Sequence, residues 1–173
     1  MKKLFTYLLA FTAVTSLFSC SDSDEPDEPV PDPTITWPSN PDFNKMDITE
    51  GMNVKINVEA PAGIKTFKVA VESEPLNNDL RITEIDLIEP AENVKTIVEE
   101  LILGEAGSPK DKTSYTLDIS NLVPLINGLT TKESDHKFTV RIVDRNDQTA
   151  KKTAVFHRVA MPKPDKDGIK TDL

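Results

Sequence analysis

The chain is poor in the residues on which disulfide-built domains and many enzymes depend. Its 173 residues include one cysteine, two histidines, six glycines and one tryptophan, and only 6% are aromatic. A single cysteine excludes an internal disulfide and any structural zinc site made of several cysteines. A formal net charge of -9 argues against nucleic-acid binding, because such proteins bring cations to the phosphates. The 38% of hydrophobic residues can form a core, and the length fits one domain.

The sequence also lacks the motifs of common catalytic chemistries. It contains no GxSxG, no P-loop and no GxGxxG. His136 and His157 have no partner at metal-binding spacing, so we expect both to be structural or to face solvent. Carboxylates are abundant, but no two of them are marked by their spacing as a glycosidase pair. We therefore predict that the protein is not an enzyme and needs no cofactor.

The N-terminus carries two lysines, a long uncharged run and then the only cysteine of the chain. Lys2 and Lys3 supply a positive start, and the run from Leu4 to Phe18 carries no charge. This run is shorter than the about 20 residues that span a bilayer, as in a signal peptide. The sequence Leu-Phe-Ser-Cys at 17–20 resembles the bacterial lipobox. The resemblance implies that residues 1–19 are removed and that Cys20 carries the lipid anchor, with palmitate among its acyl chains. A plain secretory peptide with an incidental cysteine is the alternative.

Residues 20–33 form an acidic, proline-rich tether. Six acidic residues and no basic residue lie between Cys20 and Pro33. Repelling charges and prolines favour an extended chain of about 3.1 Å per residue. The stretch resembles the acid-rich export signals of surface lipoproteins in Gram-negative gut anaerobes, which implies an outer-membrane protein that faces away from the cell. A spacer on a periplasmic lipoprotein is the alternative.

Short runs of alternating apolar and polar residues follow in the body of the chain, residues 34–160. Such alternation predicts half-buried β-strands. We expect the loop 60–63 to join two neighbouring antiparallel strands, and the turn 144–147 to close a hairpin. The expected strands cover residues 34–37, 52–58, 67–71, 115–119, 137–143 and 149–157.

Two apolar stripes in the middle of the body recur at helical spacing. The first predicts a helix that begins near Asn93 and ends at Gly104, and the second a shorter helix over 122–129. Residues 76–88 fit either a short helix or a strand. The whole pattern predicts a mostly β fold, an immunoglobulin-like antiparallel β-sandwich with short helical insertions, followed by a polar tail at 161–173. The stripes consist of Val94, Ile97, Val98, Leu101 and Ile102, and of Leu122, Leu125, Ile126 and Leu129.

Four stretches of the body resemble Ig-like lipoprotein domains of the same Gram-negative gut anaerobes. They are Ala60–Lys65, Ile85–Pro90, Tyr115–Ser120 and Phe138–Asp144. The resemblance implies an Ig-like fold and a place in the outer envelope. It brings no catalytic or binding residues with it.

Two features of the body are candidates for ligand contact. Sugars stack on exposed aromatic rings, and Trp37 is the single tryptophan, although a tryptophan where a tether enters a domain also caps the core. Asp144, Asn146 and Asp147 place three oxygen side chains in one turn, which makes them candidates for calcium. The turn does not continue to the bidentate glutamate of an EF-hand, and Asp and Asn also favour turns for local reasons.

The sequence as a whole predicts a non-enzymatic envelope lipoprotein held to the membrane by Cys20. Its expected role is that of a scaffold, adhesion or assembly module with a protein or glycan partner. An accessory carbohydrate-binding surface lipoprotein is the alternative. Exposed edges of its sheets would allow a partner strand to add.

Overall fold

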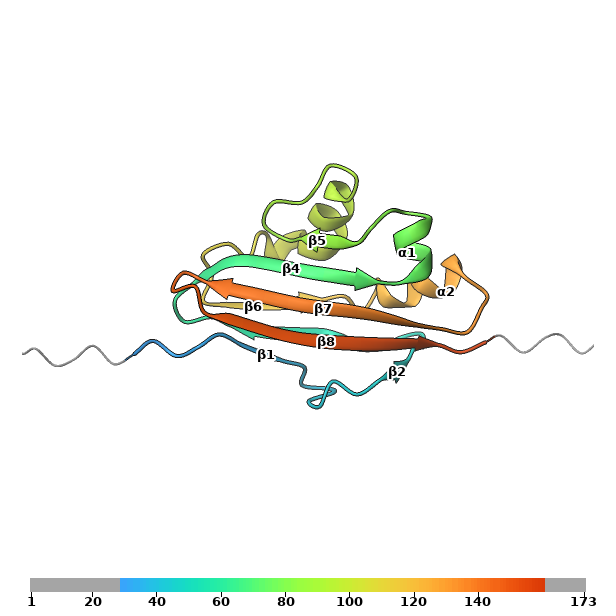
Figure 1. The fold of residues 1–173 in the computed structure, drawn as a ribbon, viewed down its shortest axis with the longest axis horizontal. Coiled ribbons are helices and arrows are strands. Elements are labelled where there is room, and N and C mark those ends of the chain that lie inside the picture. Colours follow the sequence, from blue (N-terminus) through green and yellow to red (C-terminus); the bar gives the residue numbers. More distant parts are fainter. Residues whose placement is uncertain (1–28, 161–173) are drawn as a thin grey trace, which may run out of the picture.

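The computed structural model describes residues 29–160. The expected signal peptide (1–19), Cys20, most of the expected tether and the expected tail (161–173) lie outside these residues. The described chain is mostly β, with two sheets and a few short helices (Figure 1). In this part of the chain, no helix is long and apolar enough to cross a membrane.

The smaller sheet has three antiparallel strands in the order β1-β3-β6. Its alternation of buried and exposed residues follows the predicted pattern, because Val58 and Tyr115 face each other across β3 and β6 and both are buried. The three expected strands of this sheet are present, although the one expected over 52–58 begins only at Lys55. They are β1 (Thr34–Thr36), β3 (Lys55–Glu59) and β6 (Ser114–Asp118).

The larger sheet has five strands in the order β2-β8-β7-β4-β5. The predicted hairpin of β7 and β8 is confirmed, with pairing from Ser134 opposite Arg158 to Val143 opposite Thr149. The edge strand β2 runs parallel to β8, so a purely antiparallel arrangement is wrong at this edge. The chain reaches β2 by crossing from the smaller sheet rather than by turning back through a hairpin. The strands are β2 (Met46–Asp47), β4 (Ile64–Glu72), β5 (Glu84–Asp86), β7 (Ser134–Asp144) and β8 (Thr149–Arg158).

The loop 60–63 does not join paired strands, contrary to the expectation. β3 pairs with β1 and β6, whereas β4 pairs with β5 and β7 in the other sheet. Gly63 has a φ of +90°, and a Cβ at this position would lie 3.3 Å from the backbone oxygen of Asp111. Only glycine adopts this conformation without strain, and here it turns the chain from one sheet to the other.

Both sheets bury their apolar faces in one shared core. Phe67 of β4 and Tyr115 of β6 meet edge to face, with ring centroids 5.9 Å apart, and so connect the two sheets. Trp37, just after β1, lies 5.7 Å from Phe156 of β8. Apolar packing between the sheets therefore holds the described domain together.

The helical segments gather on one side of the molecule, next to β4 and β5 (Figure 1). The ambiguous residues 76–88 contain parts of both expected elements, the end of α1 and all of β5. The expected helix at 93–104 is shorter and is wound as a π-helix, because the amide of Gly104 donates to the carbonyl of Glu99, five residues earlier. The segments are α1 (Glu74–Asn78), η1 (Ile97–Leu103), η2 (Gly104–Ala106), η3 (Val123–Leu125) and α2 (Ile126–Leu129).

Candidate functional site

Trp37 lies inside the core and offers no face to a sugar. Its relative exposure is 0%, and its ring packs edge to face on Phe43 at 5.7 Å. Of the two roles that the sequence leaves open, the structure gives Trp37 that of capping the core. A ligand contact at this ring would require the core to open.

The Asp144–Asp147 turn is closed by its own hydrogen bonds to Oδ1 of Asp144, whereas the buried Oδ2 has no hydrogen-bond partner among the described residues. The buried carboxylate of Asp144 accepts the backbone N–H groups of Asn146 at 2.9 Å and Gln148 at 2.8 Å. Asp147 forms an ion pair with Lys65 instead of turning toward Asp144. Within residues 29–160, no three carboxylate, histidine or cysteine side chains come together as a metal site. The turn therefore shows the local role of Asp and Asn in a hairpin.

His136 is fully buried between two serine hydroxyls. Its Nδ1 lies 2.8 Å from the Oγ of Ser73, and its Nε2 lies 3.0 Å from the Oγ of Ser134. Burial lowers the pKa of His136 below its ordinary 6.5, although the charge of Asp135 opposes this shift. Neither of the two cavities described below is lined by His136, so the serine–histidine contact holds elements together rather than facing a substrate.

His157 lies nearer the surface, on the opposite face of its strand from Phe156. Its Nδ1 lies 2.6 Å from a carboxylate oxygen of Asp135, and its Nε2 lies 3.5 Å from Glu133. These contacts join β8 to the start of β7. They leave His157 with a structural role at the sheet surface.

One open, polar depression of about 500 Å³ lies beside the end of β6. Burial by itself would raise the pKa of Asp118, which lines the depression. Hydrogen bonds from Ser120 and the ammonium of Lys55, 3.0 Å away, outweigh burial and hold this pKa below its usual range. No aromatic ring lines the depression, so it lacks the stacking surface that sugar binding uses.

A second cavity of about 230 Å³, which we call the apolar groove, lies on the helical side. All 17 residues that line it are apolar. Its walls come from α1, η1 and the pair η3 and α2, and its floor comes from both sheets. Representative wall residues are Leu76, Leu101 and Leu125, and the floor includes Val69, Leu117 and Phe138.

The walls of the apolar groove expose large apolar side chains to solvent. Leu101 is 58% exposed and Leu125 is 60% exposed. Seven large apolar side chains in the described residues are exposed, from 37% for Ile97 to 60% for Leu125, and five of the seven line the groove. A domain that gathers its exposed apolar side chains around one hollow has the form of a docking surface. The five are Leu80, Ile97, Leu101, Leu125 and Leu129.

The apolar groove was not predicted, because helical spacing identifies a stripe and not what covers it. The first stripe predicts a helix with one apolar face, yet Val98 is fully buried while Leu101, three residues later, is exposed. A signal was present: within 97–103 only Glu99 and Glu100 are not apolar, so more than one face of the segment is hydrophobic.

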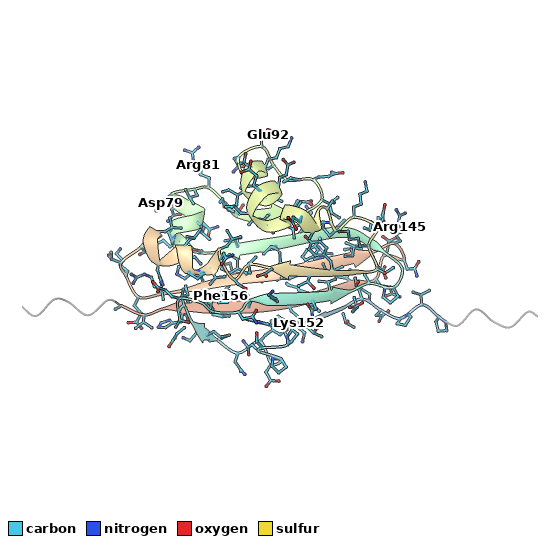
Figure 2. All side chains as sticks on the ribbon, turned by 180° about the vertical axis from the view of Figure 1, so that it is seen from behind. Asp79, Arg81, Glu92, Arg145, Lys152 and Phe156 are labelled. Carbon is cyan, nitrogen blue, oxygen red and sulfur yellow. The ribbon has the colours of Figure 1, made fainter. Side chains whose placement is uncertain are left out.

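Negative charge surrounds two walls of the apolar groove. Residues 74–81 and 92–105 contain six acidic and two basic residues, a net charge of -4, whereas 121–130 has no charged residue. The described chain as a whole has 21 acidic and 15 basic residues, a net charge of -6. Most of this excess charge therefore lies on these two walls and on the residues next to them in the chain. Asp79, Arg81 and Glu92 extend outward from this side of the molecule (Figure 2).

No family model matches the chain, and no curated protein is significantly similar to it. The apolar groove is the feature of the described residues that points most directly to a function.

Proposed function

We propose that the protein is a lipid-anchored module of the outer envelope that binds a partner through the apolar groove. Its role is non-enzymatic, as a scaffold, adhesion or assembly component, and its domain is an Ig-like sandwich. Cys20 is the anchor, the acidic tether holds the domain away from the membrane, and the domain faces outward from the cell.

One observation carries this proposal: five exposed leucine and isoleucine side chains converge on a single apolar hollow. Exposing apolar surface to water is unfavourable, at roughly 25 cal/mol per Å², and a partner that covers it recovers this free energy. The two sheets around one core support the Ig-like fold. The carbohydrate-binding alternative has no such support, because Trp37 is buried and the polar depression has no aromatic lining.

Photo-crosslinking in living cells tests the proposal. A photoreactive amino acid replaces Leu101 or Leu125 in the full-length chain, and Arg141 serves as the control position. Arg141 is exposed on the outer face of β7, away from the groove lining. We expect adducts of defined mass from positions 101 and 125 and none from 141. Equal labelling at all three positions, or none at any, would contradict a role for the groove.

A further inference from the structure

The lining of the apolar groove offers no hydrogen-bond partners, so the backbone of its occupant must form its hydrogen bonds internally. A strand laid into the groove would bury N–H and C=O groups against side chains that cannot hydrogen-bond, which is strongly unfavourable. The sheet edges nearby do not supply the missing partners, because β5 has only three residues and β6 packs against η1. A helix satisfies its backbone internally. The occupant is therefore a helix or a hydrocarbon chain.

The size of the groove favours side chains over a complete small ligand. Drug-sized ligands occupy pockets of about 300–1,000 Å³, and an apolar cavity of about 150 Å³ holds one benzene. A hollow of about 230 Å³ thus has room for one or two large apolar side chains. Helices that dock in grooves insert such side chains from successive turns and keep their polar face outside.

The negative charge of the walls favours a positively charged partner. Glu99 and Glu100 lie on η1 beside Leu101, and Asp79 lies beside Leu80 at the end of α1. Among the described residues, none of these three carboxylates has an ion-pair partner, so their charge is free to act on a ligand. Carboxylates in this position repel a fatty acid, an anionic lipid or a second copy of this acidic chain, and they attract a cationic surface.

We propose that the apolar groove binds a basic amphipathic α-helix of a partner protein. Apolar side chains on one face of that helix enter the groove beside Leu101 and Leu125, while flanking lysines or arginines meet the carboxylates of α1 and η1. This inference rests on the proposed function and names the class of partner that the same site takes.

The test uses synthetic helices and the full mature chain carrying Cys20→Ser. The probe is a labelled peptide of roughly 18 residues with leucines on one helical face and lysines on the other, long enough to form a stable helix on binding. One comparison peptide has glutamate in place of every lysine, and another has the probe's composition in scrambled order. We expect the probe to bind at least about tenfold more tightly than either, and its affinity to fall with added salt.

Variants of the chain separate the apolar from the ionic contribution. Leu101→Gln and Leu125→Gln each weaken binding of the lysine probe by about tenfold, and because both side chains are already exposed they leave the fold intact. The pair Glu99→Lys and Glu100→Lys reverses the preference toward the glutamate peptide. The matched control, Asp42→Lys with Glu50→Lys, makes the same change of charge outside the groove lining and keeps the preference for lysine.

Several results would overturn the inference. Equal binding of the lysine and glutamate peptides would show that the partner's charge does not matter. Equal binding of the scrambled peptide would show that the helical arrangement of its leucines does not matter. A dimer of the chain that Leu101→Gln dissociates would make a second copy the occupant. If the lipidated chain did not bind a probe that the Cys20→Ser chain binds, the chain's own acyl group would be the occupant of the groove.

The two proposals fail in distinguishable ways. Adducts from position 101 in cells, together with no preference for the lysine probe in solution, would leave the groove as the binding surface and exclude the basic helix as its partner. Absence of adducts in cells would count against the groove itself.

Discussion

The hydroxyl of Ser73 lies 2.8 Å from Nδ1 of the buried His136, and this contact ties the start of α1 to strand β7. Because Ser73 is the residue that precedes α1, the contact fixes one wall of the apolar groove to the larger sheet. A neutral imidazole has one donor and one acceptor nitrogen, and the hydroxyls of Ser73 and Ser134 can satisfy both. Protonation of His136 would place a positive charge in the core, and burial makes this unfavourable.

The burial of His136 predicts that acid destabilises the domain. Since burial lowers the pKa of the folded state below 6.5, the unfolded chain binds more protons near and below that pH, and the free energy of unfolding falls as the pH falls. Above this range the contribution is constant. Urea unfolding between about pH 5 and pH 8 measures the slope, which His136→Gln should flatten. Thr149→Gln is the matched control, because Thr149 is exposed at the far end of the β7–β8 hairpin from His136, and it should keep the slope. A wild-type stability that does not change with pH would contradict this role.

Gly63 should be far less tolerant of a side chain than Gly128. With φ at +90° and Asp111 oxygen 3.3 Å from a Cβ, Gly63→Ala should lower the free energy of unfolding by about 1–3 kcal/mol. Gly128 lies in α2 with nothing within 4 Å of its Cβ position, so Gly128→Ala should be neutral or stabilise by up to about 1 kcal/mol. Chemical denaturation of the two variants checks both values. Equal effects would mean that the crossing between sheets does not depend on Gly63.

Trp37 should matter for stability rather than for binding. Its ring is fully buried, so Trp37→Ala should cost about 3–5 kcal/mol. Leu125→Ala removes a side chain that is 60% exposed and should change stability by no more than about 0.5 kcal/mol. Thermal and urea unfolding compare the two. A Trp37→Ala chain that is as stable as wild type but has lost binding to a glycan array would restore Trp37 as a ligand contact.

The lipid anchor is tested at Cys20. Several acyl chains hold a protein at a membrane essentially permanently, since each buried CH₂ contributes about 0.8 kcal/mol. We expect Cys20→Ala to abolish labelling by palmitate and to release the chain from the membrane fraction. A membrane-bound, unlabelled wild-type chain would exclude the lipobox interpretation.

Orientation is tested by protease treatment of intact cells. A domain that faces outward is digested while a periplasmic control protein stays intact. Protection of the domain would contradict export to the surface, and the search for a partner would then turn to the periplasm.

The sequence predicted the elements better than their connections. Alternation placed Val58 and Tyr115 on buried strand faces, and the long runs around the turn at 144–147 were enough to predict the hairpin of β7 and β8. The crossing at Gly63 could not be predicted, because a short glycine turn suits both a hairpin and a passage between sheets. The two-residue strand β2 is too short to leave a pattern.

The candidate site was harder to predict for a related reason. A stripe of apolar residues has the same spacing whether a sheet covers it or solvent does. The π-helical winding of η1 adds a second cause, because it changes which residues share a face, and it turns Val98 inward while Leu101 stays open. The residues of the groove were therefore visible in the sequence, but their exposure was not.

The central claim is that the open leucines of the groove meet a partner in the envelope. The yield of photo-crosslinked adduct from position 101, compared with that from position 141 in the same full-length chain in living cells, measures this most directly. We predict a discrete adduct from 101 and none from 141. No adduct from 101, or the same adducts from both, would contradict the claim.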